Sequence, residues 1–359
     1  QQALDAHTGA AYTSPSSVYL QLGSTNTINI KMSNFKLYDT ALTSSDVNTL
    51  YQMGRCSNAI PKTLHIMGGM MRYNNDIGKL QIHNGVQWST IGGITATGGT
   101  ITQVNGYRLH TFTSSGTFTL INTGGYVDIL IVGGGGAGGG VSNGGGGGAG
   151  GIKFAQNFPL TPGTYTIVVG AGGAANGTGG QVGANGTNSS FSLPTNTGTG
   201  GGGGGEYCLN GAAGGSGGGA GACNGTASGG AGNQGTNSTF TGYGNNGGNS
   251  SGSSTARGGG GGGGAGSVGG VNSGSVPGQG GDGINLSATF GTDVGESGHF
   301  ASGGHGQNRQ DTGLVYNGPL GGGGGNNGVR SGLANTGGGG HGGTSNSGGS
   351  GIVIIRYLI

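Results

Sequence analysis

Charged and aromatic side chains are scarce in this chain. Only 12 Lys and Arg and 10 Asp and Glu occur in 359 residues, so 6% of the chain is charged, against roughly 25% in an ordinary globular domain. Aromatic residues make up another 6%, with a single Trp. Acid–base catalysis needs titratable side chains, and their scarcity argues against an enzyme. The basic residues are also too sparse to form a phosphate-binding stripe, so we expect no nucleic-acid partner.

Long apolar runs and metal-binding motifs are missing as well. No run approaches the ~20 residues of a membrane-spanning helix, so we expect no membrane insertion. The three cysteines form no Cys-x-x-Cys pair, which disfavours zinc. His299, His305 and His341 would have to meet in space to hold a metal, and we expect them to be solvent-exposed instead. We therefore expect neither a metal nor a cofactor.

Glycine, by contrast, is abundant and unevenly spread. Of the 101 glycines, 9 lie in residues 1–96 and the other 92 in residues 97–359. Gly-rich tracts of low charge often behave as flexible linkers. Here, however, apolar, β-branched segments bracket the tracts, at residues 126–132, 163–169 and 352–358. Disordered chains lack such segments, so we expect the tracts to be ordered.

The change in composition predicts three parts. Residues 1–60 contain strand-like segments at 18–22 and 27–38, then a capped helical pattern that Gly54 ends. Residues 61–96 contain short strand signals and an Asn-Gly hairpin turn at 84–85, and they close with a linker. Residues 97–359 hold the Gly tracts and the longest strands.

Tracts such as 133–140 and 144–151, interrupted only by Ala, suit the polyglycine II helix. This is an extended left-handed coil with three residues per turn and no internal hydrogen bonds. Side by side, such coils can satisfy one another's backbone groups, provided that no side chains separate them. Ordering glycine is costly in entropy, so we expect the coils to fold cooperatively or not at all. The predicted fold is all-β: a β-sandwich with inserted polyglycine II helices, preceded by small β modules.

Resemblances to known families support this organisation. Residues 35–51, a strand followed by Ala-Leu-Thr and a short helix, resemble the C-terminal end of concanavalin-like (laminin-G-type) jelly rolls, which implies that a larger domain starts upstream. Residues 69–88 resemble a short β module of phage and large-virus fibre proteins. The framework at 112–118, 127–136, 163–170 and 349–357 resembles the glycine-rich domain of viral and bacterial surface proteins, including tail-tip adhesins of even-T-type phages. A related receptor domain combines polyglycine helices with a TNF-like β-sandwich, and that likeness implies a jelly-roll or TNF-like sandwich here.

If the tracts form a scaffold, the connecting loops carry the side-chain chemistry. Tyr, Phe and Arg suit contacts with sugars or protein loops, although such residues can equally pack over the lattice as small apolar clusters. The candidates for receptor contact are Tyr207, Tyr243, Phe290, His299, Phe300, Arg309, Leu314 and Tyr316. Several Asn-x-Ser/Thr sequences also occur, and we attribute them to the abundance of these residues.

Cys208 and Cys223 stand 15 residues apart in one Gly-rich neighbourhood and are candidates for a disulfide. The alternative is that both remain reduced. Closing such a loop would stabilise the fold by roughly 3 kcal/mol in the chain-entropy model.

Together these features predict a non-enzymatic fibre or adhesin on a virion surface. Its partners would be a host cell-surface glycan or outer-membrane protein and other virion proteins, and analogy with viral fibres suggests a homotrimer. The alternatives are a structural coat, decoration or filament subunit without receptor binding, and a cellular secreted adhesin. All of these place the protein outside the cell or on the virion surface.

Overall fold

A computed structural model gives the fold of residues 1–359. It describes five short strands before residue 93, and then residues 93–359 except 122–123, 141–142, 176–179, 193–195, 253–256, 309–316, 327–328 and 345. The chain divides into two compact units, one of residues 1–72 with 82–88 and the other of residues 73–81 with 89–359.

Before residue 93 the described elements are strands. β1 (Val18–Leu20) pairs antiparallel with β2 (Ile30–Met32), inside the two strand-like segments that the sequence predicts. β3 (Met71–Asn74), β4 (Lys79–His83) and β5 (Trp88–Thr90) form a three-stranded sheet. The helix predicted to end at Gly54 lies outside the described residues.

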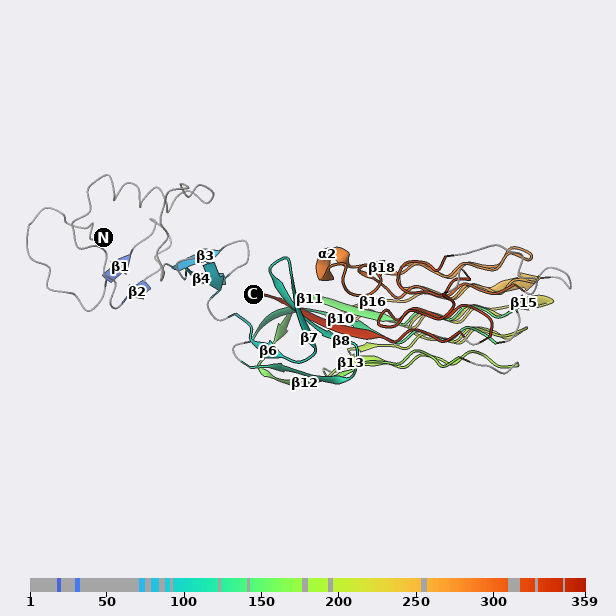
Figure 1. Ribbon diagram of the computed structural model, residues 1–359, viewed down its shortest axis with the longest axis horizontal. Helices are drawn as coiled ribbons and strands as arrows, with labels where there is room; N and C mark the ends of the chain where they lie inside the picture. Colours follow the sequence, from blue (N-terminus) through green and yellow to red (C-terminus); the bar gives the residue numbers. More distant parts are fainter. Residues whose placement is uncertain are drawn as a thin grey trace, which may run out of the picture. The chain divides into compact units, whose positions relative to one another are not determined.

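Two antiparallel sheets form the base of the Gly-rich unit (Figure 1). The six-stranded sheet has the order β16-β11-β10-β20-β8-β7, and the five-stranded sheet β14-β13-β12-β9-β6. The strands of the first sheet are β7 (Thr100–Val104), β8 (Tyr107–Phe112), β10 (Gly125–Val132), β11 (Ile152–Leu160), β16 (Thr241–Tyr243) and β20 (Ile352–Leu358). Those of the second are β6 (Ala96–Thr97), β9 (Gly116–Leu120), β12 (Gly163–Val168), β13 (Ser189–Phe191) and β14 (Thr197–Gly198). The prediction of an all-β fold is confirmed.

The six-stranded sheet is apolar on both faces. In β10, alternate residues point to opposite faces: Val127, Ile129 and Ile131 enter the core between the two sheets. Leu130 and Val132 enter a second core on the outer face. The outer core is covered by a segment containing β18 (Ile284–Asn285), α2 (Ser287–Phe290) and β19 (His299–Phe300). Burial on both faces explains why β10 reads as a continuous apolar run.

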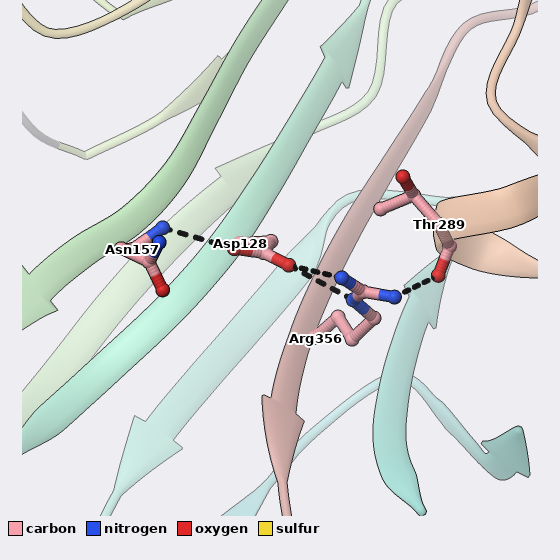
Figure 2. A network of polar contacts seen from close by, with 4 residues as sticks. All are labelled: Asp128, Asn157, Thr289 and Arg356. Atoms are coloured by element: carbon pink, nitrogen blue, oxygen red, sulfur yellow. Dashed lines mark hydrogen bonds and ion pairs between the residues drawn. The ribbon is translucent and has the colours of Figure 1, made fainter. Parts of the chain in front are cut away.

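A buried ion pair ties this covering segment to the sheet (Figure 2). Asp128 and Arg356 are direct partners in the β10–β20 ladder. The Arg356 Nε and Nη2 atoms lie 2.9 and 2.5 Å from Asp128 Oδ2, and Nη1 donates to the Thr289 carbonyl of α2. The other carboxylate oxygen accepts the Asn157 backbone N–H at 2.9 Å. The guanidinium also lies 4.1 Å from the centre of the Tyr107 ring.

The Gly tracts run side by side as extended coils, away from the sheets (Figure 1). In coil 133–140, backbone N–H groups three residues apart donate to the same neighbour, as three residues per turn requires. Residues 133, 136 and 139 donate to coil 144–151, residues 134 and 137 to coil 183–188, and residues 135 and 138 to coil 346–351. The carbonyls of coil 133–140 accept bonds from three further coils, 170–175, 199–205 and 336–343. An inner coil is therefore surrounded by hydrogen-bonding partners, as the sequence predicts. We call this bundle of hydrogen-bonded coils the lattice.

Close approach of these backbones explains the demand for glycine. A Cβ built on Gly136, Gly146 or Gly303 would lie under 3.0 Å from a carbonyl oxygen of an adjacent coil. The Cα–H bond that this Cβ would replace points at that carbonyl, which is the arrangement of a weak Cα–H···O contact. Alanine occurs at a few tract positions, such as Ala137 and Ala149, and both are fully buried.

Candidate functional site at the far ends of the coils

The far ends of the coils, opposite the sheets, carry turns and one short ribbon (Figure 1). The ribbon consists of β15 (Gly225–Ala227) paired antiparallel with β17 (Ser250–Gly252). The turn at residues 206–210 is joined to the start of this ribbon by a disulfide between Cys208 and Cys223. We call the turn, the ribbon and Arg257 the distal tip.

The turn at 206–210 is held from several directions. The Cys208 backbone N–H donates to the Ala222 carbonyl at 3.1 Å, beside the disulfide. Leu209 N–H donates to the Glu206 carbonyl at 2.6 Å. The buried Glu206 carboxylate accepts the Gln181 N–H at 2.8 Å. These contacts fix the backbone on both sides of Tyr207.

Tyr207 is 44% exposed on this braced turn. The Arg257 guanidinium carbon lies 5.2 Å from the centre of its ring, within the range of a cation–π contact. Aromatic and guanidinium groups are the side chains that most often dominate recognition surfaces. Arg257 was not among the candidates from the sequence, because nothing in the sequence places it beside Tyr207.

Beside the turn, the ribbon borders a shallow hollow of about 320 Å³. Its lining side chains are neutral and mostly polar. They belong to Thr226, Ala227, Ser228, Asn249, Ser250, Ser251, Val271 and Asn272. Sequence reasoning missed these residues, because isolated Ser, Thr and Asn in a Gly-rich chain give no local signal.

Asn side chains complete the hydrogen bonding where a coil has no backbone partner. Asn185 and Asn188, one turn apart, accept the N–H groups of Gly203 and Gly200 through their Oδ1 atoms. Asn246 and Asn249 do the same for Gly232 and Gly229. Some of the Asn-x-Ser/Thr sequences that we attributed to composition therefore contain structural amides at the threefold spacing of the coils.

Of the other predicted contact residues, the four that the structure describes lie away from the distal tip. Phe290 and Phe300 are 1% and 0% exposed in the outer core, so no aromatic face is available to a receptor and we assign both to the core. Tyr243, half-buried in β16, packs against the same core. His299 is half-buried in β19, with its Nδ1 atom 3.2 Å from the Ser297 carbonyl oxygen. Arg309, Leu314 and Tyr316 lie outside the described residues, so their role stays a prediction.

The expectation of solvent-exposed histidines is wrong at two positions. His305 and His341 are 4% and 3% exposed within the lattice. Burial lowers the pKa of His305 against the raising effect of its hydrogen bond, in which Nε2 donates to the Asn317 carbonyl at 2.8 Å. In the described part of the chain, no three His, Cys, Asp or Glu side chains gather as metal ligands.

A third buried histidine lies in the sandwich. His110 Nδ1 is 2.7 Å from the Gly98 carbonyl, to which it donates, and Nε2 is 3.0 Å from the Tyr357 hydroxyl, from which neutral imidazole accepts. Burial lowers the pKa of His110 against the raising effect of its hydrogen bond to the Gly98 carbonyl, and nearby Arg108 lowers it further. Burial also raises the pKa of Tyr357. Both groups are thus held neutral as internal hydrogen-bonding partners.

None of the helices in the described segments is long and apolar enough to cross a membrane. A profile for a family described as a glycine-rich domain matches residues 113–358 of the chain. No curated protein matches the chain significantly.

Proposed function

The chain belongs to the glycine-rich domain family, and on that premise we propose that it is a non-enzymatic adhesin that binds a host receptor through its distal tip. The observation that carries this proposal is the exposed Tyr207, which lies on a turn fixed by a disulfide and a buried carboxylate and has the half-buried Arg257 against its ring. Loops held by a rigid scaffold are where binding residues concentrate, because ordering a flexible loop would weaken binding.

The lattice supports this role because its hydrogen-bonded backbones form a rigid support for the tip although the coils carry few side chains. A coil of eight residues extends roughly 25 Å at a rise of about 3.1 Å per residue, and coil 133–140 is hydrogen-bonded along its length. The tip is therefore presented away from the sheets on a stiff support. A flexible Gly-rich linker would instead leave the tip without a fixed orientation.

The biological setting is part of the same proposal. The resemblance of the framework to viral and bacterial surface proteins supports a fibre on a virion surface, with a host glycan or outer-membrane protein as receptor. The same analogy supports a homotrimer attached to other virion proteins. A coat or filament subunit without receptor binding remains the alternative, and it requires no function of Tyr207.

Binding of the fluorescently labelled full chain to a panel of bacterial and eukaryotic cells tests the proposal. We expect saturable binding to at least one cell type, and a decrease of tenfold or more in affinity for Tyr207→Ala and for Arg257→Ala. Tyr126→Ala is the matched control, because Tyr126 is 66% exposed at the end of β10 that points away from the coils. Equal binding by all variants, or saturable binding to no cell type, would favour the structural alternative.

A further inference from the structure

The ribbon at the distal tip has two chemically different faces. Thr226 pairs with Ser251, and Ala227 with Ser250. Because successive residues of a strand point to opposite faces, Ala227 and Ser250 turn inward, where they are 5% and 1% exposed. Thr226 and Ser251 turn outward and are exposed.

The outward face continues beyond the strands. Ser228 and Asn249 occupy the next position in the same register, two residues along from Thr226 and Ser251, and are also exposed. The three hydroxyls and one amide of these residues line the hollow of about 320 Å³ together with Val271 and Asn272. We call this group of six residues the hydroxyl ledge.

The floor of the ledge is fixed by the adjacent coil. Asn272 is 7% exposed and holds the backbone of Ser251 on both sides: its Oδ1 accepts the Ser251 N–H at 2.7 Å, and its Nδ2 donates to the Ser251 carbonyl at 2.6 Å. Asn249 is fixed through its Oδ1, which accepts the Gly229 N–H at 2.9 Å. The disulfide at Cys223 anchors the start of β15. The hydroxyls are thus presented on a pre-organised surface, which lowers the entropic cost of binding.

The chemistry of the ledge selects the class of ligand. Hydroxyls donate and accept hydrogen bonds, as the hydroxyls of a sugar do. Val271 is 65% exposed at the rim and offers an apolar contact for the C–H face of a sugar ring. The lining includes no charged side chain, so nothing there compensates the desolvation of an ionic group. A hollow of this volume lies at the small end of ligand sites, which fits a single ring.

We propose that the hydroxyl ledge binds one uncharged sugar ring of the receptor. This inference rests on the proposed adhesin function and makes it specific: the receptor is a neutral glycan, engaged by the hydroxyls of Thr226, Ser228 and Ser251 beside the Tyr207–Arg257 pair.

Saturation-transfer NMR on the full chain tests the ledge directly. The probes are the methyl glycosides of glucose, galactose, mannose and N-acetylglucosamine, with the methyl glycoside of sialic acid as the charged comparison. We expect saturation transfer to at least one neutral glycoside and none to the charged one. Thr226→Val and Ser251→Ala should each weaken binding of that glycoside by tenfold or more. Thr241→Val is the matched control, since Thr241 is an exposed strand threonine in β16 at the other end of the coils.

Cell binding separates failure of this inference from failure of the proposed function. If the ledge variants bind glycoside and cells as the unmodified chain does, while Tyr207→Ala reduces cell binding, the ledge inference is wrong and the adhesin function stands. Transfer to no neutral glycoside, or preference for the charged one, would overturn the ledge inference in the same way. If the chain binds no cells at all, the adhesin function itself fails.

Discussion

Asp128 and Arg356 stand directly opposite one another on β10 and β20, and two guanidinium nitrogens share one oxygen of the carboxylate. Both side chains are largely buried, at 10% and 12% exposure. In a chain with so few charges, this pair joins three elements, because Arg356 also bonds α2 through the Thr289 carbonyl. It thereby fixes the segment that covers the outer face of the six-stranded sheet.

The pair predicts a strongly non-additive mutant cycle. Arg356→Met leaves a buried carboxylate without its partner and should lower the free energy of unfolding by roughly 3–5 kcal/mol. Asp128→Asn combined with Arg356→Met should cost less than the sum of the two single changes, because no uncompensated charge remains. Urea unfolding of the three variants measures this, and additive losses would show that the two side chains do not interact.

Glycine substitutions distinguish a packed lattice from a loose one. Gly146→Ala places a Cβ under 3.0 Å from the Gly304 carbonyl oxygen of a neighbouring coil, and we expect a loss of roughly 3 kcal/mol or more from overpacking. Gly235→Ala is the control, because no atom lies within 4 Å of its Cβ and its φ is outside the left-handed region. That change should be neutral or stabilising by up to about 1 kcal/mol. Equal thermal melting of the two variants would contradict close packing.

The buried histidines predict loss of stability in acid. The pKa values of His110 and His305 are lowered by burial from 6.5, so the unfolded chain binds more protons than the folded one once the pH falls below about 6.5. Stability is then present in full above that pH and falls below it, by at most about 1.4 kcal/mol per pH unit for each histidine. Urea unfolding between pH 8 and pH 5 measures the slope. His305→Gln should reduce this slope. An unchanged slope would show that His305 does not contribute to the loss of stability in acid.

Reduction of the disulfide should loosen the tip more than the sandwich. Cys208 and Cys223 enclose a separation of 15 residues, for which the chain-entropy model gives roughly 3 kcal/mol. We expect Cys208→Ser with Cys223→Ser to lower the melting temperature and to weaken cell binding, since Tyr207 loses its brace. Near-UV circular dichroism should still report packed aromatic residues such as Phe118 and Phe191, which are buried between the sheets. Unchanged melting and binding would contradict this role.

The sequence predicts most reliably those elements whose residue types differ from those of the adjoining segments. β10 and β20 were predictable from their apolar residues, and the coils from the lengths of the Gly tracts. The pairing of coils was not predictable, because one Gly tract offers the same backbone groups as another. Their neighbours are set instead by the strands they leave, such as β10 before coil 133–140, and by amides such as Asn185 and Asn188 at the edges.

The candidate site was also only partly predictable from the sequence. Tyr207 was a candidate because it lies on a loop between Gly tracts and because aromatic side chains suit contacts with a receptor. Phe290 and Phe300 were candidates for the same reason, yet they fill the outer core, since a sheet with two apolar faces needs large side chains on both sides. Arg257 and the hydroxyl ledge come together only through the folding of distant coils, which no local pattern records.

Native-state amide hydrogen exchange, followed by NMR on the full chain, tests the central claim most directly. If the glycine coils form a cooperative hydrogen-bonded lattice, the N–H groups of residues 133–139 should all be protected, with opening free energies close to those of β10 and β20. This should hold for N–H groups directed to each of the three neighbouring coils that accept them. Exchange of these glycines at the rate of an unstructured peptide, while the strands stay protected, would contradict the account.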